Sequence, residues 1–233
     1  MGLLTVAVRH VANATPRTRI IGLDLGDIAF PFAAGQAVMV GLHDSPLRKP
    51  YSIASAPWEF RKTGVLHLLA QVDETGALDP HLELAAPGTL IDLEGPFGTF
   101  GLPTSLADRP LLFVAGGTGI APLRSILMER LLGPGGPVIS VVYSARSPEQ
   151  FAYRAELDAM AQARRINLVL TVSRGGEGWD GRLGRIDEGM LKAAIPSLDA
   201  CCLVCGPPQL VSDSCEVLLR MGVSRDRILT DKY

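Results

Sequence analysis

The chain has 233 residues, of which 47% are hydrophobic and 20% are charged, and its formal net charge is −2. This balance is typical of globular proteins and excludes the basic composition of a nucleic-acid-binding protein. No apolar run approaches the roughly 20 residues of a membrane-spanning helix, and the N-terminus lacks a signal-peptide pattern, so we expect a cytoplasmic protein without a membrane span. The length suits either one large domain or two modest ones.

The cysteines do not have the spacing of a disulfide framework or a metal centre. Cys201, Cys202 and Cys205 fall in one apolar stretch, and Cys215 follows alone. The stretch contains a C-x-x-C spacing, but an extended strand points residues three apart to opposite faces. No second pair completes a zinc site, and no spacing suits an iron–sulfur cluster. We therefore expect no metal, so redox chemistry would require an organic cofactor.

The pattern of apolar runs changes near residue 105. Before it the runs are short and broken by glycine and proline, which favours an antiparallel barrel or sandwich. They cover residues 4–8, 19–25, 36–42, 51–55, 65–72 and 90–93. After it, strand candidates alternate with helical stretches, as a parallel sheet requires. They cover residues 111–115, 138–143, 166–172, 200–205 and 227–231. We predict two domains, 1–105 and 106–233.

A glycine-rich loop joins the first buried strand of the second half to a helix. The residues of the loop are Gly116, Gly117, Thr118 and Gly119, and Pro122 suits the first helical turn. Without side chains, such a loop lets a ligand approach backbone N–H groups at the positive end of the helix, which suits a phosphate or pyrophosphate. The alternative is a tight turn that binds nothing. We expect the next helix to begin at Ser147, because Ser147-Pro148-Glu149-Gln150 has the form of a capping box.

The sequence G-G-T-G-I-A-P after a buried strand resembles the nicotinamide-nucleotide motif of the ferredoxin–NADP reductase superfamily. Further segments resemble that family's motifs in the family's order, namely 32–36 (P-G-Q), 49–52 (R-x-Y-S), 76–79 (G-x-x-S/T), 95–100 (G-P-F-G-x-F) and 205–207 (C-G-P). The resemblance covers nearly the whole chain. It implies an FAD-binding antiparallel Greek-key β-barrel followed by an NAD(P)-binding doubly wound α/β domain with a parallel sheet.

The segment that resembles R-x-Y-S implies the flavin contacts. In the family the tyrosine stacks on the isoalloxazine and the serine hydrogen-bonds near its N5, which implies these roles for Tyr51 and Ser52. The predicted contact strand comprises Lys49, Pro50, Tyr51, Ser52 and Ile53. Lys49 replaces the usual arginine, with Arg48 before it, so a bidentate phosphate contact becomes a point charge. The residues alone also suit an ordinary barrel strand with a half-buried tyrosine.

The segment that resembles G-x-x-S/T implies that the amides of Gly76, Ala77 and Leu78 hold the flavin pyrophosphate. Asp79 stands where the family has serine or threonine. A carboxylate would repel the phosphates, unless it turns away or caps a helix while the amides make the contact.

Cys205 is the candidate nicotinamide neighbour. Ligands of doubly wound sheets bind where the winding reverses, and a strand order of 3-2-1-4-5 would put Cys205 beside the glycine loop. In the family, the cysteine of C-G-P abuts the hydride-transferring carbon of the nicotinamide, which implies a positional role for Cys205, with Gly206 and Pro207 next to it. The alternative is a small buried residue at a strand end.

Two polar segments and the C-terminus complete the predicted site. Ser173 and Arg174 resemble the pair that holds the 2′-phosphate of NADPH, and Ser144 and Arg146 fall in a segment that resembles Y-G-A-R. Each of these segments also suits plain solvated polar residues at a strand end. Residues 178–185 resemble a stretch common in NADH-using relatives, so the donor stays open between NADPH and NADH. In plant-type relatives a terminal aromatic covers the flavin, with an acid two positions earlier, which implies these roles for Tyr233 and Asp231.

Together these resemblances predict a monomeric flavin-dependent reductase that passes a hydride from NADPH or NADH to FAD. The electrons would then pass to a separate ferredoxin, flavodoxin or oxygenase component, or to a small molecule. The predicted catalytic residues are Ser52, Cys205 and Tyr233. Two alternatives are an electron-transfer subunit of a larger complex and a nucleotide sensor without flavin, which Lys49 and Asp79 favour.

Overall fold

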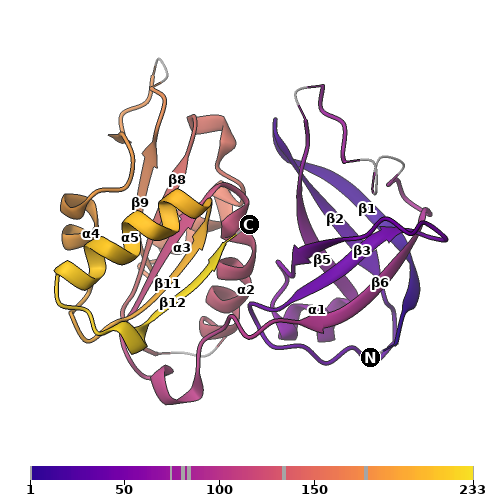
Figure 1. Ribbon diagram of the computed structural model, residues 1–233, viewed down its shortest axis with the longest axis horizontal. Coiled ribbons are helices and arrows are strands. Elements are labelled where there is room, and N and C mark those ends of the chain that lie inside the picture. Colours follow the sequence, from indigo (N-terminus) through magenta and orange to yellow (C-terminus); the bar gives the residue numbers. More distant parts are fainter. Residues whose placement is uncertain are drawn as a thin grey trace.

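The computed structural model describes residues 2–73, 75–79, 82, 85–132, 135–175 and 178–232. They form two domains that lie side by side, an antiparallel barrel and a parallel sheet covered by helices (Figure 1). The last strand of the barrel ends at Phe97, and the first strand of the parallel sheet begins at Leu111. The predicted boundary between residues 105 and 106 lies in this connection and stays a prediction.

The barrel is one six-stranded antiparallel sheet with the order β4-β3-β6-β1-β2-β5. Its strands are β1 (Leu4–Thr15), β2 (Thr18–Asp24), β3 (Ala37–Leu42), β4 (Lys49–Ser52), β5 (Val65–Gln71) and β6 (Leu90–Phe97). A bridge between Ile53 and Leu68 joins the two outer strands and closes the sheet. Val38 and Val40 are fully buried while Met39 between them is only partly covered, which is the alternation of a strand with one face on the core.

A short helix inside the barrel domain, α1 (Pro57–Thr63), is absent from the sequence prediction. The carboxylate of Glu59 accepts a hydrogen bond from the Ala56 amide at 2.7 Å and caps its first turn. The helix ends at Gly64, whose φ of 66° lies in the left-handed region that favours glycine. Seven residues are too few for an apolar period to be recognised in the sequence.

The second domain has a six-stranded parallel sheet with the order β10-β9-β8-β7-β11-β12. Its strands are β7 (Leu111–Gly116), β8 (Ile139–Ala145), β9 (Asn167–Val172), β10 (Arg182–Leu183), β11 (Cys201–Gly206) and β12 (Ile228–Lys232). Without the short β10, which was not predicted, this is the expected order 3-2-1-4-5. The winding reverses between β7 and β11, and every residue of both strands is buried.

Helices cover both faces of this sheet. They are α2 (Ile120–Arg130), α3 (Arg154–Gln162), α4 (Glu188–Ala194) and α5 (Pro208–Arg220). Helices α2 and α3 pack on the side of Phe113 and Leu203, whereas α4 and α5 pack on the opposite side, on Leu112 and Val204. The doubly wound α/β fold is therefore confirmed. Within the part of the chain that the structure describes, no helix has the length and apolar character needed to cross a bilayer.

The helix expected at Ser147 begins later. Pro148–Gln150 forms only a 3-10 turn, and α3 starts at Arg154. The Ser147 hydroxyl bonds to the Glu149 carboxylate at 2.6 Å instead of capping the backbone. The backbone at Phe151 is extended, and the Phe151 ring packs edge-on to Tyr143 at a centroid distance of 5.1 Å. Burial of this ring interrupts the helical path that the capping box predicts.

Candidate functional site

The glycine loop packs directly against the end of β11. After β7 the chain makes a 3-10 turn, η2 (Gly117–Gly119), and enters α2. A Cβ atom on Gly119 would lie 2.4 Å from the carbonyl oxygen of Cys205, so only glycine fits. On the other side, the Tyr143 hydroxyl donates to the Gly117 carbonyl at 3.0 Å and accepts from the Ala152 amide at 3.3 Å. The backbone of the loop is thus fixed from two neighbouring strands.

Cys205 lies beside this loop, as the strand order predicts. It is paired in register with Ala115 of β7 and with Asp231 of β12. The Cys205 side chain is buried, and burial, with a smaller effect of Asp231, raises the pKa of its thiol far above the ordinary value. Burial also raises the pKa of Asp231. A neutral thiol is a poor nucleophile, which suits a positional role better than covalent chemistry.

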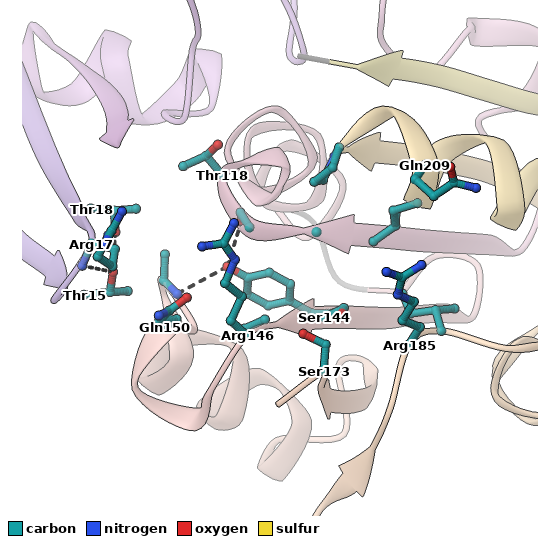
Figure 2. A pocket seen from close by; sticks show the side chains of 18 of the residues that line it. Thr15, Arg17, Thr18, Thr118, Ser144, Arg146, Gln150, Ser173, Arg185 and Gln209 are labelled. Atoms are coloured by element: carbon teal, nitrogen blue, oxygen red, sulfur yellow. Dashed lines mark hydrogen bonds between the residues drawn. The ribbon is translucent and has the colours of Figure 1, made fainter. Parts of the chain in front are cut away.

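A cavity of about 350 Å³ opens between the two domains next to the glycine loop. Its walls include Thr15, Arg17, Thr18 and Gln71 from the barrel. The predicted residues that line it are Gly116, Gly117, Thr118, Ser144, Arg146, Ser173 and Pro207. Figure 2 shows Thr15, Arg17 and Thr18 of the barrel at the left, and Thr118, Ser144, Arg146 and Ser173 of the second domain to their right. The structure therefore brings together most of the predicted nucleotide residues.

Other predicted residues of this domain lie behind the cavity wall or away from it. Gly119, at the end of the loop, is buried, as are Pro122 in α2 and Gly206 at the end of β11. Arg174 is exposed, and its backbone amide bonds to the Arg146 carbonyl at 2.9 Å. Arg174 is not among the residues that line the cavity. Its predicted contact with the nucleotide stays a prediction.

The cavity carries positive charge that the sequence prediction missed in part. Arg17, Arg146 and Arg185 line it, with Asp213 as the acid among its described lining residues. Arg17 sits in the hairpin between β1 and β2, and no spacing in the sequence connects it to the glycine loop. Arg185 follows the G-W-D-G stretch, where the local pattern gives no direction for its side chain. Three guanidinium groups suit a ligand with several phosphates.

Strand β4, the predicted flavin contact, presents Tyr51 and Ser52 half-buried, paired in register with Val38 and Ala37. Burial, with a smaller effect of Asp79, raises the pKa of Tyr51, so its phenol stays neutral at physiological pH. Ile53, also predicted as a contact, points into the barrel core, and its amide donates to the Gln36 carbonyl at 2.9 Å. A partly covered neutral phenol next to a serine hydroxyl fits the ring of a flavin.

The groups expected at the flavin phosphates are paired with one another. The Lys49 ammonium lies 2.7 Å from the Asp79 carboxylate, and Arg48 lies 3.5 Å from Asp92. The Asp79 carboxylate therefore pairs with Lys49, the residue that replaces the arginine of the family. Because the lysine ammonium has three N–H donors, a phosphate can share it with Asp79. Tyr51 and Ser52 therefore suit a flavin ring, whereas the paired Lys49 suits a diphosphate less well than the arginine of the family would.

The amides predicted to hold the pyrophosphate donate within their own turn. The Ala77 amide donates to the Asp73 carboxylate at 3.0 Å, and the Gly76 amide donates to the Asp73 carbonyl at 3.2 Å. A phosphate would have to compete with Asp73 for these donors. The contacts predicted for Gly76, Ala77 and Leu78 stay a prediction. Tyr233, the predicted terminal aromatic, lies outside the described residues.

Comparisons with known proteins agree with both halves. Residues 5–101 match the family described as "Oxidoreductase FAD-binding domain", and residues 113–216 match "Oxidoreductase NAD-binding domain". The chain is 35% identical to ferredoxin–NADP reductase B of Sorangium cellulosum over 98% of this chain and 95% of that protein. It is 29% identical to NADH-cytochrome b5 reductase 1 of Eremothecium gossypii, covering 73% of this chain and 61% of that protein.

Solved structures share the arrangement of the two domains. The cytochrome P450 reductase GcoB of Amycolatopsis superimposes with a TM-score of 0.85 at 26% identity, covering 99% of this chain and 69% of that one. A ferredoxin NADP+ reductase from Neisseria gonorrhoeae with bound FAD and NADP superimposes with a TM-score of 0.79 at 20% identity, covering 100% and 99%. With the relative that matches it almost end to end, these findings show that the chain belongs to the ferredoxin–NADP reductase superfamily and is an FAD-dependent NAD(P)H oxidoreductase.

Proposed function

We propose that this reductase delivers electrons to a separate acceptor protein, a ferredoxin, a flavodoxin or an oxygenase component. The observation that carries the proposal is the 35% identity to a ferredoxin–NADP reductase over 95% of that relative. The P450 reductase with the same two-domain fold supports the class of acceptor more broadly. We also propose that the chain acts as a monomer in the cytoplasm, as the sequence predicts.

In this proposal the predicted catalytic residues and the glycine loop each have one task. FAD, when bound, accepts a hydride from NAD(P)H and releases electrons singly or in pairs. Tyr51 packs on the flavin ring, and the Ser52 hydroxyl hydrogen-bonds at its edge. Cys205 lies beside the reacting end of the nicotinamide, and the glycine loop holds the pyrophosphate of the nucleotide. Tyr233 covers the flavin face until nicotinamide arrives, with Asp231 beside the thiol of Cys205.

For the donor, we propose NADPH, held at its 2′-phosphate by Ser173 together with Arg185 and Arg146. All three line the cavity between the domains. A guanidinium binds a phosphate through two parallel hydrogen bonds, and NADH lacks this phosphate. The proposal keeps the predicted Ser173 and replaces Arg174 by cations that face the cavity.

The donor experiment compares Arg185→Ala with Arg174→Ala. We expect Arg185→Ala to lower kcat/KM for NADPH by about 10-fold or more, because a hydrogen bond to a charged group contributes about 1.5–3 kcal/mol. The value for NADH should change much less, and Arg174→Ala should leave the NADPH to NADH ratio near that of the wild type. A loss of NADPH selectivity in Arg174→Ala alone would mean that Arg174, and not Arg185, contacts the 2′-phosphate.

The acceptor experiment uses the purified flavoprotein with NADPH. We expect the flavin absorption bands to bleach under anaerobic conditions and to recover when oxidised ferredoxin or flavodoxin is added, with a recovery rate that depends on acceptor concentration. Recovery only with small quinones or ferricyanide would contradict a protein acceptor. A colourless protein that still bound nucleotide would support the sensor alternative instead.

A further inference from the structure

Arg124 is a buried charge on the face of α2 that meets the barrel. Its side chain is only 10% exposed. It belongs to the second domain, but helix α2 also lies against helix α1 of the barrel, and Figure 1 shows α2 on the side of the parallel sheet that faces the barrel. Burying a guanidinium is costly unless its donors are satisfied, so an arginine here calls for a physical reason.

All the donors of Arg124 are satisfied, and they reach both domains. Toward the barrel it donates to the Ala54 carbonyl at 2.8 Å and to both carboxylate oxygens of Glu59 at 2.9 Å. Within its own domain it donates to both carboxylate oxygens of Glu156 at 2.7 Å. The guanidinium also lies 4.9 Å from the centre of the Tyr153 ring. Arg124 is thus a planar bridge between two carboxylates from different domains.

The charges make this bridge specific for arginine. Burial favours neutral Glu59, but the hydrogen bonds and charge of Arg124 outweigh it and lower the pKa of Glu59. Two carboxylates that converge on one cation repel each other when the cation is removed. A lysine keeps the charge but presents a single nitrogen and cannot form the two planar forks.

Neighbouring contacts hold the same segment of the barrel. The Ser125 hydroxyl donates to the Ser55 carbonyl at 2.7 Å, and the Ser55 hydroxyl accepts from the His67 amide at 2.7 Å. The Trp58 indole donates to the Met128 carbonyl at 3.1 Å. Residues 54–58 are therefore held by successive turns of α2.

The bridge connects the two segments that carry the cofactor contacts. Ala54 comes two residues after Ser52 of the flavin strand. Arg124 lies in the first turns of α2, the helix that begins at Ile120 directly after the glycine loop. The guanidinium of Arg124 is thus about one helical turn from the proposed nucleotide contacts. Its barrel partner Ala54 is two residues from the proposed flavin contacts. A shift of this bridge shifts one set of contacts against the other.

We propose that Arg124 is a positioning residue for hydride transfer, which sets the separation of the flavin strand and the glycine loop through its bonds to Ala54 and Glu59. The inference rests on the proposed sites of flavin and nucleotide at these two segments. It does not depend on the acceptor protein or on the preferred donor. Arg124 contacts neither reacting group, so its effect falls on the rate of transfer rather than on binding.

The test is anaerobic stopped-flow reduction of the bound flavin by NADPH or NADH, whichever reduces the wild type faster. Arg124→Lys is compared with Arg130→Lys, the same substitution on the same helix, where Arg130 donates to the Ala107 carbonyl at 3.0 Å. Glu59→Asp shortens the barrel partner without changing α2. Each variant yields a limiting rate constant for reduction, a nucleotide dissociation constant and a flavin absorption spectrum. No acceptor is present, so failure of the proposed acceptor leaves this assay unaffected.

We expect Arg124→Lys to lower the limiting rate constant about 10- to 100-fold, because a misplacement of about 1 Å has effects of this size. Glu59→Asp should lower it in the same direction. Nucleotide dissociation constants and flavin spectra should stay near wild type, and Arg130→Lys should change neither rate nor binding. Wild-type rates in both Arg124→Lys and Glu59→Asp, or an equal loss in Arg130→Lys, would overturn the proposal. Should Arg124→Lys fail to fold, the rate in Glu59→Asp decides.

Discussion

The two halves of the proposed cofactor site differ in what forms them: backbone on the nucleotide side and side chains on the flavin side. On the nucleotide side, backbone packs on backbone, with Gly119 against Cys205 and the Gly117 carbonyl held by Tyr143. On the flavin side, the predicted phosphate region is formed by the side chains of Lys49 and Asp79, each about half exposed. A site made of backbone tolerates no added atoms, whereas a site made of side chains tolerates a change when a second change compensates it.

The two departures of the flavin side from the family pattern are therefore one feature. Lysine instead of arginine weakens the grip on a phosphate, and aspartate instead of serine or threonine adds repulsion. In the structure the two residues bond to each other at 2.7 Å, so the charge of each is neutralised by the other.

The largest predicted effect comes from a substitution in the glycine loop, where the site is formed by backbone. In Gly119→Ala the new Cβ would lie 2.4 Å from the Cys205 carbonyl oxygen and 2.7 Å from the Gly206 amide nitrogen. Because these are backbone atoms, the ends of β7 and β11 must separate, which costs about 1–3 kcal/mol as overpacking does. We expect kcat/KM for NAD(P)H to fall about 100-fold. Steady-state kinetics and thermal unfolding measure the two effects.

Gly189→Ala is the matched control for this substitution. Gly189 lies in α4, and a Cβ there would have its nearest neighbour, the Asp187 carboxylate, at 3.4 Å. The alanine should leave activity unchanged and change stability by no more than about 1 kcal/mol. Equal activity of Gly119→Ala and wild type would contradict a nucleotide site made by close backbone packing.

The same difference explains what the sequence could predict. The glycine loop, the strand order and the position of Cys205 follow from chain pattern, because glycine spacing and buried strands are local signals of backbone geometry. Arg17, Arg185 and the Arg124 bridge do not, because each depends on where a long side chain from one element meets a distant element. Asp79 was recognised as a mismatch, but its pairing with Lys49 needed the folded chain.

The next predicted effect is a change in FAD affinity, caused by substitutions of the side chains on the flavin side. Asp79→Ser frees the Lys49 ammonium and removes a negative charge, so we expect FAD to bind about 5-fold more tightly, which corresponds to about 1 kcal/mol. Lys49→Ser leaves the carboxylate without its partner and should weaken FAD binding by a similar factor. Quenching of flavin fluorescence on titration measures both dissociation constants.

Riboflavin is the control ligand, because it has the flavin ring and no phosphate. Its affinity should be nearly the same in wild type, Asp79→Ser and Lys49→Ser. If riboflavin and FAD shifted by the same factor, the Lys49 and Asp79 pair would act on the ring or on folding, and the assignment of this pair to the phosphates would be wrong.

The smallest predicted effect is a pH dependence of the stability of the barrel. It comes from two side chains, so it has no counterpart in the backbone packing on the nucleotide side. Asp92 is 3% exposed and bonds to His43 at 2.8 Å, and this hydrogen bond, opposed by burial, raises the pKa of His43 above its ordinary value of 6.5. A raised pKa means that the bond to protonated His43 stabilises the fold fully below pH 6.5 and is lost as pH rises through the raised value. His43→Gln should therefore lower Tm more at pH 6 than at pH 9.

Thr5→Val supplies the contrast that makes this prediction specific. The Thr5 hydroxyl donates to the same oxygen of Asp92 at 2.8 Å but does not titrate. Its removal should lower Tm by a similar amount at both pH values, whereas the loss in His43→Gln should shrink at the higher pH. A loss in His43→Gln that stayed constant with pH would mean that His43 contributes as a neutral hydrogen-bond donor. The stability of the barrel would then depend on the geometry around Asp92 and not on charge. In that respect the barrel would differ less from the nucleotide side, where backbone packing forms the site.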